Sequence, residues 1–320
     1  MLKVVVIGYG DMFCNIIAGT LDSGSKIVGV FRHDRVKMNN CIRWIKDIIN
    51  PDSDYNYVKS YNLHEIKAKS ANSNNFRKQL LKLNPDIVLV ASWSEKLTPE
   101  TFNLPKIATI NVHPSLLPRY RGPNPYVQTI LHLEEKSGVT FHLVDSKIDR
   151  GSILDQRVVE IKDSYTGKEL KGKTVLAARG AVCELLEKLS EDVVFPVSQN
   201  ERLASYYPAE YEPELDFTKT SREISAQIRA IHPWGKTFFF IGNLTFVPDP
   251  YKIQIEDNTT EYSDAGTIVT KSLKDNSIKI LCGDNKLIKL SGLKQHGLIQ
   301  QFFTKQAISK VDVGKMAMFQ

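Results

Sequence analysis

Short apolar runs alternate with longer segments of helical period through the first 200 residues of the chain. Residues 3–7, 26–31 and 86–91 each begin with one charged residue and continue as an apolar run, which is typical of buried strands. Residues 75–83 and 174–190 carry apolar side chains every three or four positions, which predicts helices. Strands that alternate with helices imply a mostly parallel sheet with helices on both faces. The predicted fold class is therefore α/β.

The pattern changes after residue 200. Residues 201–216 are rich in Pro, Glu and Tyr and are predicted to be an extended linker. A helix is expected at 221–231, capped by Thr220 or Ser221. Short β-rich segments separated by turn residues follow at 237–241, 244–247, 267–270, 278–282 and 287–290. This spacing predicts a small β-barrel, so we expect one domain over residues 1–200 and another over 217–320.

Composition agrees with a two-domain globular protein. The chain has 320 residues, of which 42% are hydrophobic and 24% charged. Its formal net charge is +6, but residues 201–320 hold 15 Lys and Arg against 14 Asp and Glu. A domain that grips a phosphate backbone is usually more one-sided in charge.

The spacing of the cysteines and the lengths of the apolar runs indicate where in the cell the protein is expected. The cysteines form no CxxC pair, so we expect reduced thiols without structural zinc: Cys14, Cys41, Cys183 and Cys282. The first residues enter a strand at once and do not look like a signal peptide. No window approaches the roughly 20 apolar residues that a membrane helix needs. A soluble, cytoplasmic protein without membrane partners is expected.

Polar residues that suit carbonyl chemistry follow one predicted strand. Residues 108–110 predict a short buried strand, so Asn111 and His113 lie at or just past its end. Side chains two apart on an extended segment point to the same face. Two prolines keep the next loop from coiling into helix, and Asp149 lies between the two segments of a predicted hairpin, residues 140–144 and 152–161. An amide, an imidazole and a carboxylate are thereby available to one reacting carbonyl.

This pattern resembles the active-site signature of the 10-formyltetrahydrofolate-dependent formyltransferases. The similarity rests on residues 111–122 (Asn-Val-His-Pro-Ser-Leu-Leu-Pro-Arg-Tyr-Arg-Gly), 138–140 (Gly-Val-Thr) and 148–151 (Ile-Asp-Arg-Gly). The resemblance implies a Rossmann-like catalytic domain followed by an OB-like C-terminal domain. It also implies formyl transfer from 10-formyltetrahydrofolate to a primary amine, with no metal.

The resemblance places the family's catalytic residues on Asn111, His113 and Asp149. An asparagine amide suits donation to a developing oxyanion without adding charge. An imidazole suits handling of the amine proton. The carboxylate of Asp149 suits pairing with His113 or fixing a water that takes this proton. This chemistry requires no nucleophilic side chain from the protein.

Two loops are implied to hold the folate, largely through backbone groups. They contain Trp93, Ser94, Glu95, Lys96, Leu97, Val144, Asp145 and Ile148. Trp93 is expected to line the pocket or to plug the sheet edge. Residues from Ser115 to Gly122 are implied to cover the acceptor, with Arg119 and Arg121 facing a phosphate.

We predict the acceptor from the positions at which this sequence departs from the pattern of other family members. Methionyl-tRNA formyltransferases carry a basic, glycine-containing loop after the second strand, and residues 32–41 lack that character. The opening with Tyr9, Asp11 and Met12 is similar to enzymes that formylate nucleotide-linked 4-amino sugars. Residues 240–243 are similar to those enzymes as well. The expected acceptor is therefore a nucleotide-linked amino sugar, with initiator methionyl-tRNA as the alternative.

The residues also bear on two other activities. Hydrolysis of formyltetrahydrofolate uses the same three residue types, and the C-terminal barrel favours transfer instead. A nicotinamide-dependent dehydrogenase would match the glycines at 8 and 10, but Phe13 stands where the dinucleotide fingerprint has its third glycine. The one residue that favours a ribose contact of the kind such an enzyme makes is Asp34. The sequence does not indicate an oligomeric state.

Overall fold

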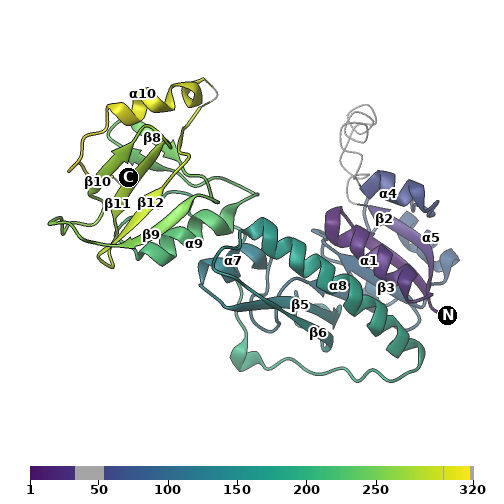
Figure 1. The fold of residues 1–320 in the computed structure, drawn as a ribbon. Helices are drawn as coiled ribbons and strands as arrows, with labels where there is room; N and C mark the ends of the chain where they lie inside the picture. Colours follow the sequence, from purple (N-terminus) through teal and green to yellow (C-terminus); the bar gives the residue numbers. More distant parts are fainter. Residues whose placement is uncertain (33–53, 298, 318–320) are drawn as a thin grey trace. The chain divides into compact units, whose positions relative to one another are not determined.

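The computed structural model describes residues 1–32, 54–297 and 299–317 (Figure 1). The predicted departure at residues 33–41, with Asp34 in it, lies outside these ranges. The chain divides into two compact units, which we describe separately. The N-terminal unit comprises Met1–Pro125, Lys136–Glu160 and Lys171–Pro208. The C-terminal unit comprises Tyr126–Glu135, Ile161–Leu170 and Ala209–Gln320.

The N-terminal unit is built on a six-stranded sheet of order β2-β1-β3-β4-β5-β6. Its strands are β1 (Lys3–Gly8), β2 (Lys26–Arg32), β3 (Ile87–Ala91), β4 (Ala108–His113), β5 (Lys136–Leu143) and β6 (Ile153–Glu160). The first four in this order pair in parallel, whereas β5 and β6 pair antiparallel. The α/β class and the hairpin are confirmed, and the sheet is mixed because the β5–β6 hairpin joins it through an antiparallel pairing of β5 with β4.

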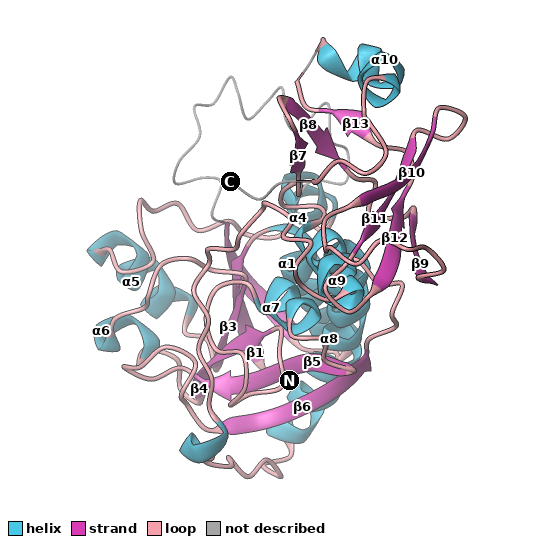
Figure 2. Ribbon diagram, turned by 90° about the vertical axis from the view of Figure 1, so that its left-hand side faces the viewer, coloured by secondary structure: helices cyan, strands magenta, loops and turns pink. Residues whose placement is uncertain are grey.

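Helices cover both faces of this sheet. Alternate side chains of β1 point to opposite faces, so Val4 and Val6 pack with α1 (Gly10–Asp22) and α8 (Gly167–Ser190). Val5 and Ile7 pack on the other side with α5 (Asn74–Leu83). Figure 2 shows α5 and α6 on the side of the sheet opposite α1 and α8. The remaining short helices of this unit are α4 (Asp54–Ser60), α6 (Pro99–Phe102) and the 3₁₀ turn η1 (Glu201–Leu203), whereas α7 (Pro125–Leu131) falls almost entirely in the C-terminal unit.

The C-terminal unit contains two antiparallel sheets and a capped helix. Helix α9 (Ser221–Ile231) starts at a capping box in which Thr220 and Glu223 each satisfy the other's backbone N–H. One sheet has the order β10-β11-β12-β9, and the other β13-β8-β7. The elements are β7 (Phe239–Ile241), β8 (Leu244–Val247), β9 (Ile253–Asp257), β10 (Ile268–Ser272), β11 (Ser277–Leu281), β12 (Lys286–Leu290), β13 (Lys294–Gln295), η2 (Gln300–Phe303) and α10 (Thr304–Ser309). An OB-like closure of these sheets stays a prediction.

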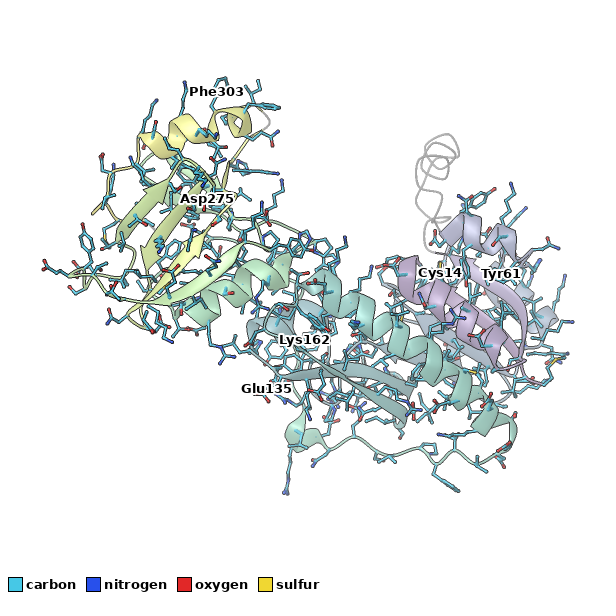
Figure 3. The ribbon with its side chains drawn as sticks, in the orientation of Figure 1. Cys14, Tyr61, Glu135, Lys162, Asp275 and Phe303 are labelled. Atoms are coloured by element: carbon cyan, nitrogen blue, oxygen red, sulfur yellow. The ribbon has the colours of Figure 1, made fainter. Side chains whose placement is uncertain are left out.

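Two further properties concern the described residues. None of their helices combines the length and apolar character needed to cross a bilayer. Cys14, Cys183 and Cys282 are free thiols there. Cys14 lies on α1 (Figure 3), where burial, with Asp54 and Asp11 nearby, raises its pKa to about 12. This thiol is therefore unreactive at neutral pH.

Candidate active site

Strands β4 and β5 together present the polar side chains of the site. Asn111 and His113 both lie within β4, two residues apart, and so on one face. The antiparallel register sets Asn111 opposite His142 and His113 opposite Thr140. Side chains directly opposite one another across strands are close neighbours, so strand pairing alone delivers a second imidazole beside Asn111.

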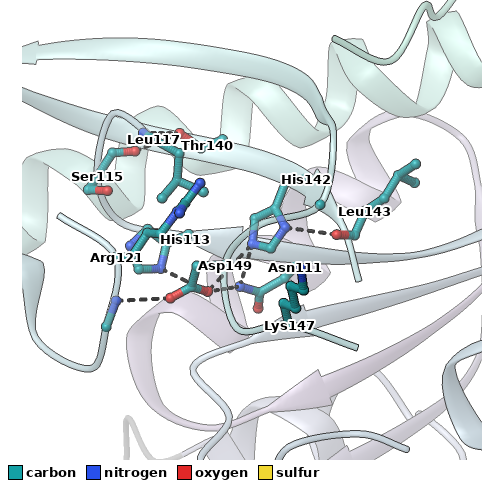
Figure 4. A network of polar contacts seen from close by, with 12 residues as sticks. Asn111, His113, Ser115, Leu117, Arg121, Thr140, His142, Leu143, Lys147 and Asp149 are labelled. Carbon is teal, nitrogen blue, oxygen red and sulfur yellow. Dashed lines mark hydrogen bonds and ion pairs between the residues drawn. The ribbon is translucent and has the colours of Figure 1, made fainter. Parts of the chain in front are cut away.

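The carboxylate of Asp149 is where these side chains meet (Figure 4). Its Oδ1 lies 3.4 Å from Asn111 Nδ2 and 3.6 Å from His113 Nδ1. The same oxygen lies 3.6 Å from His142 Nε2. The structure thus brings the three residues predicted from the sequence together, and it adds His142. The signal that would have found His142 is its place two residues after Thr140 on the predicted hairpin.

Backbone carbonyls fix the hydrogens on both imidazoles. His113 Nε2 lies 2.8 Å from the carbonyl oxygen of Tyr120, so Nε2 carries the hydrogen and donates it. In the neutral ring, Nδ1 then has a free lone pair on the side of Asp149. His142 Nδ1 likewise donates to the carbonyl oxygen of Leu143 at 2.9 Å. Its Nε2 then accepts from Asn111 Nδ2 at 3.0 Å, which fixes the way the asparagine amide faces.

The charge states of His113 and Asp149 follow from their surroundings. Burial lowers the pKa of His113 below 6.5, although the nearby Asp149 carboxylate opposes the shift. Burial of Asp149 raises its pKa, but His113, His142 and the backbone N–H of Gly122 outweigh it and hold the pKa at about 2. At neutral pH the site therefore contains a neutral imidazole next to an ionised carboxylate.

Thr140 anchors the loop that follows β4. Its hydroxyl donates to the carbonyl oxygen of Ser115 at 2.6 Å. The hydroxyl oxygen of Thr140 in turn accepts from the Leu117 backbone N–H at 3.2 Å and from Gln156 Nε2 at 2.8 Å. The hydroxyl is buried, so these bonds are protected from water. Thr140 thereby fixes the start of the loop that leads to Gly122.

A second segment, residues 199–207, which we call the strap, holds the other end of the site. Gln199 Nε2 donates to the carbonyl oxygens of Asp149 at 2.9 Å and Gly151 at 2.8 Å. Asp149 has a φ of 54°, a left-handed conformation that costs free energy in a residue with a side chain. A Cβ at Gly151 would lie 1.8 Å from the Leu143 carbonyl oxygen, so only glycine fits there. The strap and the glycine together hold the turn that presents the carboxylate.

The strap also binds the loop over the site. Arg121 is 4% exposed, and its guanidinium contacts Glu201 at 2.7 and 3.0 Å and Gln199 at 2.7 Å. The Tyr120 and Tyr207 rings stack at 5.1 Å. Arg121, expected to face a phosphate, has its guanidinium buried against an acidic partner far along the sequence. These contacts hold the loop in place, and a long-range pair of this kind leaves no signal at residues 119–122.

Gly122 connects the loop to the carboxylate. Its backbone N–H donates to Asp149 Oδ2 at 3.0 Å. Its φ is 109°, and a Cβ there would lie 2.3 Å from the Tyr207 carbonyl oxygen. A side chain at this position would therefore displace either the strap or the hydrogen bond to Asp149.

The other predicted acceptor contacts fall into two groups. Ser115 is fully buried, with its hydroxyl bonded to the Arg119 carbonyl oxygen at 2.8 Å, and Met12 is 2% exposed within the core. Neither side chain faces solvent, because the sheet and its helices enclose both. Asp11 forms an ion pair with α8 at 2.6 Å. Tyr9 and Arg119 have exposed side chains.

The first predicted folate loop is held mostly by its own packing. Trp93 contacts a phenylalanine ring of β2 at 5.3 Å, and Leu97 is 5% exposed, so both belong to the core. The Trp93 side chain thus packs against the sheet, which is one of the two positions expected for it. Glu95 accepts from the Ala71 backbone N–H at 3.0 Å. Ser94 and Lys96 are exposed.

The second predicted folate loop precedes Asp149. The Val144 backbone N–H donates to the Thr109 carbonyl oxygen at 2.9 Å, which continues the β4–β5 pairing. Asp145 accepts from the Lys147 backbone N–H at 2.7 Å, and Ile148 is 55% exposed. The described part of the chain contains no group of three or more His, Cys, Asp or Glu residues placed to hold a metal ion.

Residues 2–186 match the family model described as formyl transferase, and residues 210–302 match the formyl transferase C-terminal domain. The chain therefore belongs to the formyl transferase family, enzymes that transfer formyl groups. Methionyl-tRNA formyltransferase of Enterococcus faecalis is 26% identical over 310 residues, covering 94% of this chain and 95% of that protein. The Clostridioides difficile enzyme of that name is 27% identical over 301 residues, with 90% of each covered.

Solved structures share the fold. An N-formyltransferase from Helicobacter canadensis, in complex with folinic acid and dTDP-3-aminofucose, superposes with a TM-score of 0.66 at 19% identity. This match covers 91% of this chain and 99% of that one. A 4-N formyltransferase from Francisella tularensis has a TM-score of 0.57 at 22% identity, covering 76% of this chain and 93% of that one.

Proposed function

We propose that the protein transfers the formyl group of 10-formyltetrahydrofolate to a primary amine, with Asn111, His113 and Asp149 as catalytic residues. The observation that carries this proposal is the single carboxylate oxygen of Asp149, which lies within 3.6 Å of a side-chain nitrogen of both Asn111 and His113. The folinic acid in the Helicobacter canadensis structure supports a folate donor.

Asn111 stabilises the negative charge that develops on the formyl oxygen. One hydrogen of its amide donates to His142 at 3.0 Å, and the other faces Asp149 at the long distance of 3.4 Å. The second contact is the weaker one, so its hydrogen turns to the oxyanion while His142 keeps the amide in place. Pre-oriented donors of this kind contribute most when charge develops in the transition state.

His113 accepts the proton that the amine loses. Its lone pair is on Nδ1, the ring atom 3.6 Å from Asp149. Its lowered pKa keeps the ring neutral, and so ready to accept, at pH 7. Once protonated, the ring faces an ionised carboxylate, and this attraction lowers the energy of the imidazolium. The balance of the reaction is one C–N bond formed and one broken, with the amine proton passing to His113 and then to the departing folate nitrogen.

For the acceptor we propose a nucleotide-linked amino sugar, as in the Helicobacter canadensis complex. The near-neutral charge of residues 201–320 supports a small acceptor rather than a polyanion. In this proposal the acceptor contacts four residues: Tyr9, Asp11, Arg119 and Gly122. Initiator methionyl-tRNA is the second candidate because the Enterococcus faecalis relative carries that activity in its name. A cytoplasmic location and an OB-like C-terminal domain belong to the same proposal.

A paired assay tests this function. Purified enzyme is incubated with 10-formyltetrahydrofolate and either UDP- and dTDP-linked amino sugars or charged initiator tRNA, and the formylated product is measured. Formylated sugar nucleotide is the expected product. Formylated methionyl-tRNA would replace the proposed acceptor by the second one and keep the reaction. Release of formate without a formylated acceptor would establish hydrolysis instead.

A further inference from the structure

The C-terminal unit contains a cavity of about 500 Å³ that none of the formyl-transfer residues reaches. It is lined by the end of α9, by residues 247–251 after β8, and by residues 292–297 around β13. All of its lining residues belong to the C-terminal unit. The volume falls in the range of about 300–1,000 Å³ that is usual for small-molecule sites.

Residues with nitrogen-bearing side chains line this cavity. Lys236 and Lys294 line it, together with His232 and His296. Within residues 54–297 and 299–317, none of these four side-chain groups has a hydrogen bond or an ion pair. Two ammonium groups without partners at one concave surface attract an anion.

The carboxylate in the described lining does not neutralise these lysines. Asp249 accepts from the Tyr251 backbone N–H at 3.0 Å, which closes the turn after β8. Its other oxygen faces Lys252 Nζ at 3.5 Å. Both oxygens are thus used within the turn, so the lining keeps a net positive charge.

The lining also contains a flat apolar surface. Tyr251 is 55% exposed, and its ring meets the His232 ring at 5.4 Å and an angle of 79°. Pro248 and Pro250 flank it in the lining. Aromatic faces of this kind stack planar rings such as nucleobases. A bare inorganic anion would leave this surface unused, and an apolar ligand would leave the lysines unpaired.

We propose that the cavity binds a free nucleotide, with its phosphates on Lys236 and Lys294 and its base against Tyr251. This site is separate from Asn111, His113 and Asp149, so it stands whichever acceptor the enzyme formylates. The ligand class follows from the combination of unpaired cations with an exposed aromatic ring in one cavity of suitable size.

The test is calorimetric titration of the full-length protein with UDP, combined with hydrogen–deuterium exchange. Three proteins are compared: the wild type, Lys236→Ala/Lys294→Ala, and the control Lys305→Ala/Lys310→Ala, which removes two exposed lysines outside the cavity. We expect UDP to protect residues 247–252 and 292–297 from exchange. We expect the Kd at this site to rise about 10-fold or more in the cavity variant and to stay unchanged in the control.

Exchange separates this site from binding elsewhere. Protection confined to the N-terminal unit, or an unchanged Kd in the cavity variant, would overturn the proposal. Pyrophosphate that binds as tightly as UDP would also overturn it, because the base would then contribute nothing. If the wild-type protein shows no formyl transfer, the proposed function is refuted. The result of this titration does not depend on that outcome.

Discussion

The side-chain amide of Gln199 donates to the carbonyl oxygen of Asp149 at 2.9 Å, while its own oxygen accepts from Arg121 at 2.7 Å. Gly122, the next residue after Arg121, donates its N–H to the Asp149 carboxylate at 3.0 Å. A closed ring of hydrogen bonds thus runs from the backbone of Asp149 through the strap and back to its side chain. One glutamine fixes both the turn that bears the carboxylate and the loop that faces it.

Replacing Gln199 by Ala is therefore expected to slow catalysis more than it weakens binding. Two carbonyl oxygens lose their donor, and Asp149 is free to leave its left-handed conformation. Because small misplacements of catalytic groups are costly, we expect kcat to fall about 10- to 100-fold with KM changed by less than about threefold. Gln199→Glu keeps an acceptor for Arg121 but no donor, so it is expected to be equally slow. Gln254→Ala, an exposed glutamine of β9, is the control; wild-type kcat in Gln199→Ala would exclude the positioning role.

His142 is expected to act through Asn111. His142→Phe keeps a ring of similar size in the strand but removes the acceptor that holds the asparagine amide. We expect kcat to fall about 10- to 100-fold while the thermal unfolding midpoint changes little, since the ring volume is retained. His64→Ala, an exposed histidine, serves as the control in the same steady-state assay. An unchanged kcat in His142→Phe would show that Asn111 is oriented without it.

The pH dependence of the reaction follows from His113. Burial lowers the pKa of its ring, so the neutral, proton-accepting form persists below pH 6.5. The rate is expected to stay level from pH 8 downward and to fall only below about pH 6.5, as the ring becomes protonated. Asp149 raises the pKa of His113, so Asp149→Asn is expected to move this acid limb to lower pH in addition to reducing kcat. A limb that moves to higher pH in this variant would contradict the assignment.

The ion pair between Glu201 and Arg121 is expected to affect stability with a definite pH dependence. Arg121, through a hydrogen bond, lowers the pKa of Glu201 below 4.5. A carboxyl whose folded pKa is depressed adds stability above its unfolded pKa, and this stability disappears as the pH falls through the folded value. Glu201→Gln is therefore expected to lower the thermal unfolding midpoint at pH 7 relative to the wild type. The difference from the wild type is expected to disappear as the pH falls through the lowered pKa of Glu201; a constant difference at all pH values would refute this pair.

Local patterns predicted the strands that carry the site but not the contacts between distant segments. The β-branched run at residues 3–7 matches β1 (Lys3–Gly8), because buried parallel strands are continuously apolar. Strand β9 (Ile253–Asp257) escaped prediction because alternate exposure leaves it only two apolar residues. Asn111 and His113 were visible through their spacing in one segment. Gln199 was not, since its partners lie 48 to 78 residues away and only the fold brings them together.

Arg121 is a second residue whose contacts local sequence patterns did not predict. Its position in an arginine-containing loop predicted an exposed phosphate contact, and nothing near it in sequence indicates Glu201. A buried guanidinium needs a partner, and the chain supplies one 80 residues later. Long-range polar pairs of this kind depend on loop paths that hydrophobic patterning does not encode.

The central claim is that Asp149 supports formyl transfer through His113 and Asn111. The most direct measurement is the single-turnover rate of formyl transfer from 10-formyltetrahydrofolate to an amino-sugar nucleotide by the wild type and by Asp149→Asn. Asparagine keeps the shape of the side chain and removes its charge. We predict a rate at least about 100-fold lower in the variant, which stays folded at the assay temperature. A folded Asp149→Asn enzyme that transfers formyl groups at the wild-type rate would contradict the account.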